Sequence, residues 1–278
     1  HGGLTRLFTG LRRPKDPKVG TDVAGIVEAV GPNVTRLKPG DEVFGACPGA
    51  CAEYASAKAD RVVPKPPHVS FEQAGAVGIG AITALQGLRD KGRIRAGQKV
   101  LINGASGSVG TFAVQIAKAF GAEVTAVCSP RNVDQARSLG ADHVIDYTKE
   151  DFARNGQRYD LIFDVVTNHS VRTYRRALNR GGSCVFIGFG FPHLSWLKLI
   201  GHLIGDPIRS RLGDKKFGFM IAKFNEKDLN ILGELLGSGK IVSAIDRRYP
   251  LSQTREAMIY LGEGHARGKI AITVGPEA

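Results

Sequence analysis

The sequence predicts an α/β protein built around a doubly wound parallel sheet. Between residues 99 and 190, short apolar runs typical of buried strands alternate with segments typical of amphipathic helices. Gly121, Gly140 and Gly181 stand where helices should end. Strands that alternate with helices form a parallel sheet covered on both faces. The chain has 278 residues, more than one ordinary core requires, so we expect two domains.

The expected elements of the alternating region follow the apolar pattern in order. The strands are expected at 99–103, 123–127, 143–145, 160–165 and 183–187. The helices are expected at 109–120, 133–139 and 170–178.

The segments on either side of this region differ in character. Short glycine-bounded runs at 23–30, 42–45 and 52–55 have no helices between them, which predicts an antiparallel β region up to about residue 70. A helix over 71–88 should lead into the parallel sheet. Near the C-terminus we expect helices at 228–236 and 252–261 and a final strand at 269–274.

A glycine-rich turn between the first expected strand and helix of the sheet indicates a phosphate site. The turn is spaced Gly104-x-x-Gly107-x-x-Gly110. Glycines let the backbone approach an anion, and N–H groups at the start of a helix attract negative charge. Residues Ser106, Gly107, Ser108, Val109 and Gly110 are therefore candidates for binding the pyrophosphate of a dinucleotide. The spacing departs from the standard fingerprint, and a glycine turn without a ligand is the alternative.

The end of the second strand predicts which nicotinamide dinucleotide is bound. It reads Cys128-Ser129-Pro130-Arg131 and lacks the carboxylate that would bind a ribose 2′-hydroxyl and repel a 2′-phosphate. Ser129 and Arg131 can instead donate to a 2′-phosphate. We therefore expect NADPH, with the alternative that Arg131 only solvates the start of a helix.

Charge and cysteine content narrow the functional classes. The net charge of +12 is dispersed and its clusters are not interleaved with aromatic residues, so nucleic acid is not an expected partner. Residues 194–216 combine an apolar face with basic residues, which favours a lid or subunit contact, with a peripheral membrane contact as the alternative. Four cysteines without a disulfide framework favour a reducing compartment, the cytoplasm, with an organelle left open.

Several motifs in a fixed order resemble one enzyme family. They are residues 20–31, Gly-Thr-Asp-Val-Ala-Gly-Ile-Val-Glu-Ala-Val-Gly; residues 39–45, Pro-Gly-Asp-Glu-Val-Phe-Gly; the triplet Ala52-Glu53-Tyr54; the turn at 104–110; residues 140–147; and His265-Ala266-Arg267-Gly268-Lys269. Together they resemble the medium-chain dehydrogenase/reductase superfamily and, within it, the zinc-independent quinone oxidoreductases.

The resemblance implies a Rossmann domain over 83–223 and a GroES-like catalytic domain made of 1–82 and 224–278, with the active-site cleft between them. Compared with the family, the strands that precede the position of His1 are expected to be missing. The implied activity is NADPH-dependent reduction of quinones or of the C=C bond of α,β-unsaturated carbonyls, in a homodimer. The alternative is an NADPH-binding structural or membrane-associated protein without efficient turnover.

The resemblance also assigns individual residues. Ser129, Arg131 and Tyr147 should line the 2′-phosphate, and Thr83 should approach the nicotinamide amide. Thr167, Gly188 and Phe189 should border the nicotinamide; ordinary packing or capping is the alternative for Tyr147 and Thr167.

No metal is expected. Gly20-Thr21-Asp22 stands where zinc-dependent relatives have Gly-His-Glu, and Cys47 and Cys51 lack a second pair of ligands. No general acid is evident, because packing is favoured over proton donation for Tyr54, so the catalytic residues are unknown.

Overall fold

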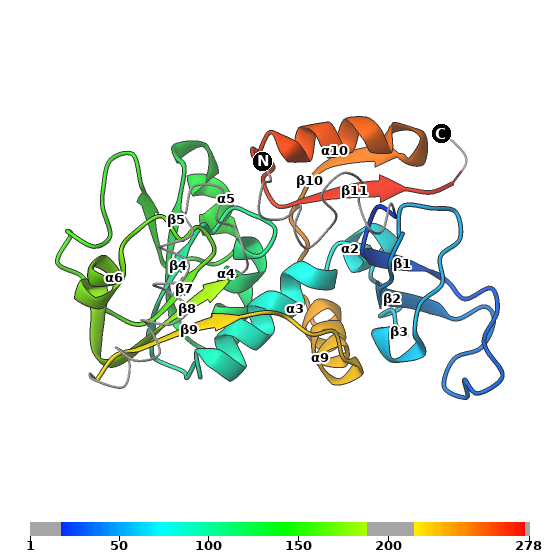
Figure 1. The fold of residues 1–278 in the computed structure, drawn as a ribbon, viewed down its shortest axis with the longest axis horizontal. Helices are drawn as coiled ribbons and strands as arrows, with labels where there is room; N and C mark the ends of the chain where they lie inside the picture. The colour runs from blue at the N-terminus through cyan, green and yellow to red at the C-terminus, as the bar shows by residue number, and fades with distance from the viewer. Residues whose placement is uncertain (1–17, 188–213, 276–278) are drawn as a thin grey trace, which may run out of the picture.

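The computed structural model describes residues 18–187 and 214–275, which form two lobes joined by a central helix (Figure 1). The larger lobe holds the parallel sheet and the smaller lobe holds two short sheets. Helix α3 (Gly78–Gln86) runs between them and continues into the π-helical turn η2 (Gly87–Lys91). The domain boundary expected at 82/83 falls inside α3, and the one expected at 223/224 falls just before α9 (Glu226–Gly237).

The larger lobe confirms the predicted doubly wound sheet. Its six strands are all parallel and lie in the order β6-β5-β4-β7-β8-β9. They are β4 (Lys99–Asn103), β5 (Glu123–Cys128), β6 (His143–Asp146), β7 (Tyr159–Asp164), β8 (Leu178–Ile187) and β9 (Lys216–Met220). The helices of this lobe are α4 (Gly110–Ala119), η3 (Pro130–Asn132), α5 (Val133–Ser138) and α6 (Val171–Ala177). The order reverses between β4 and β7, which is where such sheets bind ligands.

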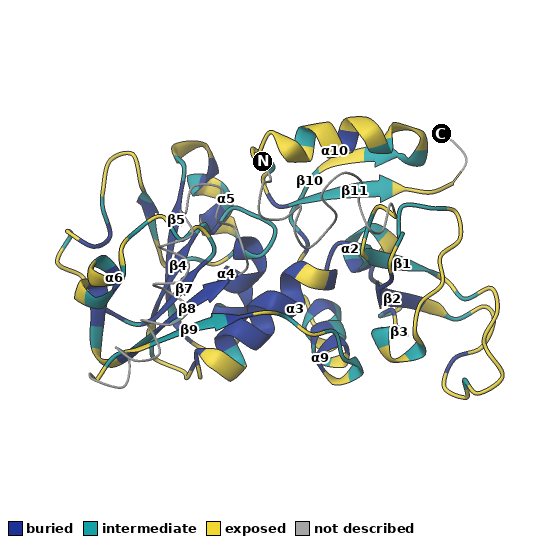
Figure 2. Cartoon of the chain, viewed as in Figure 1, coloured by how far each residue is buried: buried dark blue, intermediate teal, exposed yellow. Residues whose placement is uncertain are grey.

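Both faces of the sheet are buried, as near-continuous apolar strands require. One face packs with α3 and α4 through residues such as Ile102, Phe112 and Leu85. The other face packs with α6 through Leu101, Ile162 and Tyr174, among others. Figure 2 shows the result as a dark core of strands and of the two helices α3 and α4.

The smaller lobe contains the predicted antiparallel β region and a separate two-stranded sheet. Strands β1 (Asp22–Ile26), β2 (Glu42–Ala46) and β3 (Val62–Pro64) pair antiparallel, with β2 central. Strands β10 (Ile245–Pro250) and β11 (Lys269–Thr273) pair in parallel. The remaining elements are η1 (Ala59–Arg61), α2 (Phe71–Gly75), η5 (Leu251–Gln253) and α10 (Thr254–Gly262).

Two sequence predictions in the smaller lobe are wrong. Residues 52–55 do not form a strand: the chain bends there, and Tyr54 is 76% exposed, so its expected packing role fails as well. The helix expected over 71–88 is interrupted after Gly75. The interruption has a long-range cause, because the N–H of Ile79 donates to Asp22 Oδ1 (2.8 Å) at the start of a new helix.

Asp22 joins three segments that are far apart in the sequence. Its Oδ1 caps α3 through Ile79, and its Oδ2 lies 2.5 Å from Lys269 Nζ on β11. Both side chains of the ion pair are about nine-tenths buried, at 12% and 11% exposure. The pair therefore fixes β1 and β11 on either side of the N-terminus of α3.

Asp228 makes a second junction, between α9 and the end of α3. It is 2% exposed and its carboxylate accepts from Gln86 Nε2 (2.7 Å), Arg89 Nη1 (2.7 Å) and Asn225 Nδ2 (2.8 Å). Burial raises the pKa of Asp228, but the hydrogen bonds from Arg89, Gln86 and Asn225 outweigh burial and leave the pKa below its usual value. The carboxylate is therefore charged and fully engaged in the folded protein.

We expect Asp228→Asn to lower the free energy of unfolding at pH 7 by about 3 kcal/mol, because it removes the charge that the buried donors face. Since the folded pKa lies below that of an unfolded carboxyl, about 3.9, the contribution is complete above that pH and is lost as pH falls through the folded value. Equilibrium urea denaturation at pH 7 and at pH 3 measures both effects. The control Asp134→Asn, whose side chain is 98% exposed, should change stability by less than about 0.5 kcal/mol. Equal stability of wild type and Asp228→Asn at pH 7 would contradict this role.

Candidate cofactor site

The predicted binding residues gather at the carboxyl edge of the parallel sheet. The register pairs Asn103, the last residue of β4, with Val127 of β5 and with Asp164, the last residue of β7. Cys128 at the end of β5 pairs with Asp146 at the end of β6. The segments that follow these strands, which contain the glycine turn, Ser129, Tyr147 and Thr167, therefore lie along one edge.

The glycine turn can close only because side chains are absent from it. A Cβ on Gly110 would overlap the carbonyl oxygen of Gly104, and one on Gly104, whose φ is +87°, would lie 2.7 Å from Val166 Cγ2. Helix α3 lies equally close to the other side of the turn, since a Cβ on Gly80 of α3 would lie 2.6 Å from the carbonyl oxygen of Ser108. The turn is thus held between the loop after β7 and helix α3.

Main-chain donors of this turn are available to a ligand. The N–H groups of Gly104 and Ala105 bond to the carbonyl of Val127, and that of Thr111 bonds to the carbonyl of Gly107. Within the described parts of the chain, the N–H groups of Ser106, Ser108, Val109 and Gly110 have no acceptor. These donors lie at the positive end of α4, an arrangement that favours binding of a phosphate. The geometry fits the pyrophosphate of a dinucleotide.

A buried carboxylate, which sequence reasoning missed, shapes the loop after β7. Asp164 is fully buried, and its Oδ1 accepts from Asn103 Nδ2 (2.9 Å) and from the N–H groups of Val166 and Thr167 (3.0 Å each). The second oxygen, Oδ2, has no hydrogen-bond partner in the described structure. Thr167 has a φ of +56°, which is unusual for a branched residue, and these bonds hold it there. Asp164 therefore sets the path of the loop that contains Thr167.

Arg131 and its neighbours connect the end of β5 with the smaller lobe. Arg131 Nη2 donates to the carbonyl oxygen of His265 (2.8 Å), and Gln135 Nε2 donates to that of Arg267 (2.9 Å). Ser129 Oγ accepts from Asn132 Nδ2 (2.9 Å), and the buried Oδ1 of Asn132 has no partner among the described residues. The guanidinium of Arg131 keeps further N–H groups for an anion.

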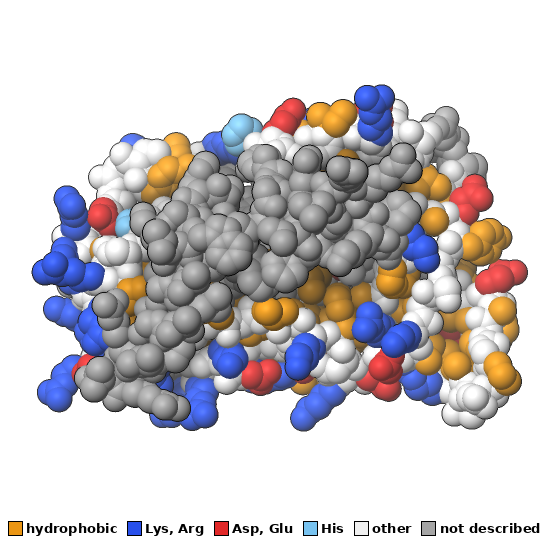
Figure 3. Space-filling view, in the orientation of Figure 1, with side chains coloured by type: hydrophobic (Ala, Val, Ile, Leu, Met, Phe, Trp, Pro, Cys, Tyr) orange, Lys and Arg blue, Asp and Glu red, His pale blue; other side chains and the backbone are white. Residues whose placement is uncertain are grey.

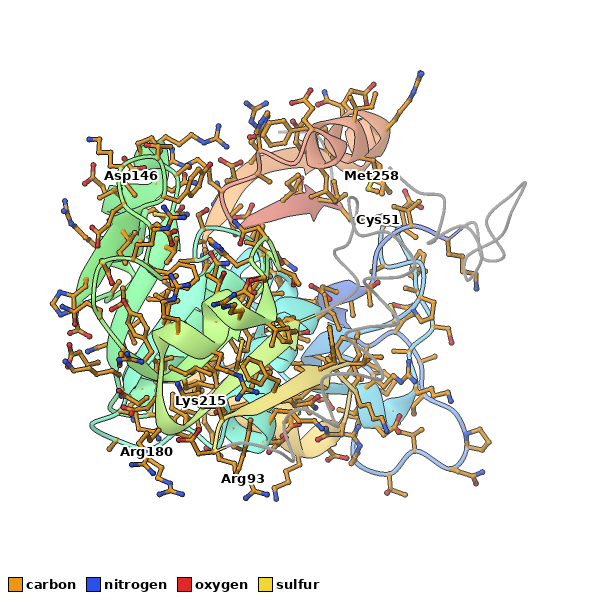
Figure 4. All side chains as sticks on the ribbon, turned by 60° about the vertical axis from the view of Figure 1, so that its left-hand side comes forward. Cys51, Arg93, Asp146, Arg180, Lys215 and Met258 are labelled. Atoms are coloured by element: carbon orange, nitrogen blue, oxygen red, sulfur yellow. The ribbon has the colours of Figure 1, made fainter. Side chains whose placement is uncertain are left out.

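The remaining predicted residues differ in how far they are exposed to a ligand, and two of them lie outside the described residues. Tyr147 is 60% exposed beyond β6, near Asp146, which Figure 4 labels at the rim of the sheet. Thr83 is buried inside α3 and donates its hydroxyl proton to the carbonyl of Ile79 (2.6 Å), so it can offer a ligand only an acceptor. Gly188 and Phe189 lie outside the described residues, as does all of 194–216 before Asp214.

The cysteines show no sign of reactive thiolates. Cys128 and Cys184 are buried in strands β5 and β8, as their apolar surroundings predicted. Burial raises the pKa of Cys128 to about 11, with a further contribution from the charge of Asp146. Burial also raises the pKa of Cys47 and Cys51 in the smaller lobe. In residues 18–187 and 214–275, no three His, Cys, Asp or Glu side chains are grouped as a metal site would require.

A large groove lies apart from the glycine turn, in the smaller lobe. Its volume is about 1320 Å³, and its walls come from β1, β11, α10 and the segment around Cys51. Figure 4 shows Cys51 and Met258 of α10 close together in this part of the molecule. The lining is mainly apolar and includes Asp22, Ile79 and Lys269, so the groove reaches the N-terminus of α3. None of the described helices is long and apolar enough to cross a bilayer.

Comparisons with known proteins agree with this arrangement. Two family models match the chain: an alcohol dehydrogenase GroES-like domain over residues 4–67 and a zinc-binding dehydrogenase domain over residues 139–272. The chain is similar to a mouse protein named mitochondrial NAD(P)H oxidoreductase RTN4IP1, at 32% identity over 92% of this chain and 70% of that protein.

Two further similarities extend over nearly the whole chain. A trans-enoyl reductase from Aspergillus terreus is 34% identical over 98% of this chain and 80% of its own length. The structure of a quinone oxidoreductase from Coxiella burnetii superposes with a TM-score of 0.81, at 28% identity, covering 98% of this chain and 84% of that one.

The close packing of the turn predicts the effect of one methyl group. We expect Gly110→Ala to displace the carbonyl of Gly104, to lower stability by about 1–3 kcal/mol and to weaken NADPH binding at least tenfold. Thermal unfolding and a titration followed by nicotinamide fluorescence measure the two effects. Gly218→Ala on β9 is the matched control, because its Cβ would meet nothing within 4 Å. Wild-type stability and affinity in Gly110→Ala would show that the turn tolerates a side chain.

Proposed function

Because the chain belongs to the medium-chain dehydrogenase/reductase superfamily, as a quinone oxidoreductase-like member, we propose that it is an NADPH-dependent, zinc-independent reductase. Its proposed substrates are quinones or the C=C bond of α,β-unsaturated carbonyls. The observation that carries the proposal is the set of unpaired N–H groups at Ser106, Ser108, Val109 and Gly110, at the switch point of the sheet.

The proposed preference for NADPH rests on the segment after β5. This segment has no carboxylate to accept from a 2′-hydroxyl, and it offers the Ser129 hydroxyl and the Arg131 guanidinium. Arg131 already spans to His265 with one N–H, so a bound 2′-phosphate would lie between the two lobes. Tyr147, exposed beyond β6, is the proposed third wall of this subsite.

In the proposed mechanism the coenzyme, when bound, supplies a hydride to the electron-poor carbon of the substrate. The residues of this chain would bind the coenzyme and orient it. The free N–H groups at 106 and 108–110 would hold the pyrophosphate, and Asp164 would keep Thr167 and its loop against the turn. No side chain is assigned as proton donor, because Tyr54, the residue that the sequence offered for this role, is exposed on a bend.

Zinc independence is proposed from the residues at the zinc-dependent motif. Thr21 is not a usual zinc ligand, and the carboxylate of Asp22 is engaged by Lys269 and Ile79. Cys47 and Cys51 are the cysteines of the smaller lobe, and their pair falls short of a tetrahedral site.

The substrate class and cellular context are proposed by analogy. A relative named trans-enoyl reductase supports reduction of a conjugated C=C bond, and a neighbour named quinone oxidoreductase supports quinones. We propose a homodimer with a small-molecule substrate, in the cytoplasm or in an organelle, since one relative is named mitochondrial.

Removal of Arg131 tests the coenzyme preference. We expect Arg131→Ala to lower the ratio of kcat/KM for NADPH over NADH at least tenfold, because a charge-assisted hydrogen bond contributes about 1.5–3 kcal/mol. Steady-state kinetics with each coenzyme measure the ratio. Arg137→Ala, which removes an exposed guanidinium from the same lobe, should leave the ratio unchanged. The assignment fails if Arg131→Ala also leaves it unchanged.

The reaction is tested with simple acceptors. We expect NADPH to be oxidised by 9,10-phenanthrenequinone or by a reactive enone, with the same rate before and after dialysis against a zinc chelator. Absorbance at 340 nm follows the reaction, and elemental analysis measures zinc. Tight NADPH binding without oxidation by any acceptor would favour the non-catalytic alternative, and loss of activity with loss of zinc would overturn zinc independence.

A further inference from the structure

A second electrostatic feature lies on the opposite edge of the larger lobe. Six cationic side chains gather there, and we refer to them as the basic surface: Arg158, Arg172, Arg175, Arg176, Arg180 and Lys215. Arg158 directly precedes β7, Lys215 directly precedes β9 and Arg180 lies near the start of β8, so these residues mark the amino ends of the strands. Figure 3 shows blue side chains crowded at this end, and Figure 4 places Arg180 and Lys215 together there.

Contacts within the basic surface hold three of its side chains, those of Arg158, Arg175 and Lys215, in place. Arg158 Nη1 donates to the carbonyl oxygen of Arg176 (2.8 Å), and Lys215 Nζ donates to that of Arg175 (2.7 Å). The Arg175 guanidinium lies over the ring of Phe217, 5.6 Å from its centroid. The C-terminal half of α6 is thus fixed between two cations from neighbouring segments.

The positive charge of this surface is poorly compensated. Arg180 lies 3.5 Å from Asp214. No carboxylate in the described parts of the chain lies within ion-pair distance of Arg158, Arg172, Arg176 or Lys215. Burial lowers the pKa of Lys215. The charge of Asp214 opposes this shift, whereas the charges of Arg158 and Arg175 act in the same direction as burial. Like charges held together in this way repel one another, and an anionic partner would relieve that repulsion.

The basic surface is separate from the cofactor site. The unpaired N–H groups, Arg131 and Thr167 lie beyond the carboxyl ends of the strands, whereas Arg158, Arg180 and Lys215 of the basic surface lie at the amino ends. A partner bound to the basic surface would therefore leave the coenzyme edge open.

We propose that the basic surface docks the protein onto an anionic lipid bilayer. Exposed Arg172 and Arg176, one turn apart on α6, can each bind phosphate or carboxylate headgroups through two N–H groups. Binding to an anionic bilayer requires only that positive charges come within a Debye length of the membrane surface. The described residues offer no stacking platform for single-stranded nucleic acid here, because Tyr174 is buried and Phe217 is half-buried beneath Arg175. This inference does not depend on the proposed reductase activity.

Vesicle co-sedimentation without coenzyme tests the docking surface. The probes are vesicles of phosphatidylcholine alone and vesicles with 30% phosphatidylserine, in 0.1 M NaCl. The test variant is Arg172→Glu with Arg176→Glu, because both side chains are exposed and neither holds a main-chain carbonyl. The matched control is Lys58→Glu with Arg255→Glu, which makes the same charge change on exposed residues of the smaller lobe. Thermal unfolding confirms that both double variants are folded.

We expect wild type to bind the anionic vesicles only and to be released by 1 M NaCl. The Arg172/Arg176 variant should lose at least tenfold in partition coefficient, since each cation near an anionic surface contributes about fivefold. The Lys58/Arg255 control should stay within about twofold of wild type. Equal losses in the two variants, no binding by wild type, or stronger binding to poly(U) than to the vesicles would each overturn the proposal.

Discussion

The candidate site depends on how closely the backbone of residues 104–110 packs against its surroundings. Gly110 must approach the carbonyl of Gly104, and Gly80 must approach the carbonyl of Ser108, at distances that leave no room for a side chain. Because the turn is this tight, helix α4 begins directly above the end of β4 and its first N–H groups stay unpaired. The candidate site for an anion therefore follows from packing, before any charged side chain contributes.

Buried polar junctions then fix the two lobes relative to this turn. Asp22 ties β1 and β11 to the first turn of α3, and Asp228 ties α9 to its end. Gln115 of α4 adds another tie through two bonds to the main chain of Val242 (2.8 and 2.9 Å). A buried polar or charged group that loses its partner destabilises the fold. Each junction therefore disfavours any arrangement of the lobes that breaks it.

Much of the larger lobe could be predicted from the sequence because its signals are local. Buried parallel strands and the helices between them leave apolar periodicity, and the strands β4 to β7 lie where it indicated. Strands β3, β9 and β10 escaped prediction, since they are short or carry charged residues such as those of Ile245–Pro250. The break before α3 was also missed, because its cause is Asp22, more than fifty residues away.

Within the candidate site, the sequence predicted the turn and the segment after β5, but not the groups that position them. Asn103 and Asp164 act through a contact between neighbouring strands that no spacing in the chain indicates. The most direct test of this anion site is an NMR titration of the ¹⁵N-labelled protein with NADPH. We expect the amide resonances of Ser106, Ser108, Val109 and Gly110 to shift most strongly. Saturable binding that leaves these amides unmoved, or no binding at all, would contradict this expectation.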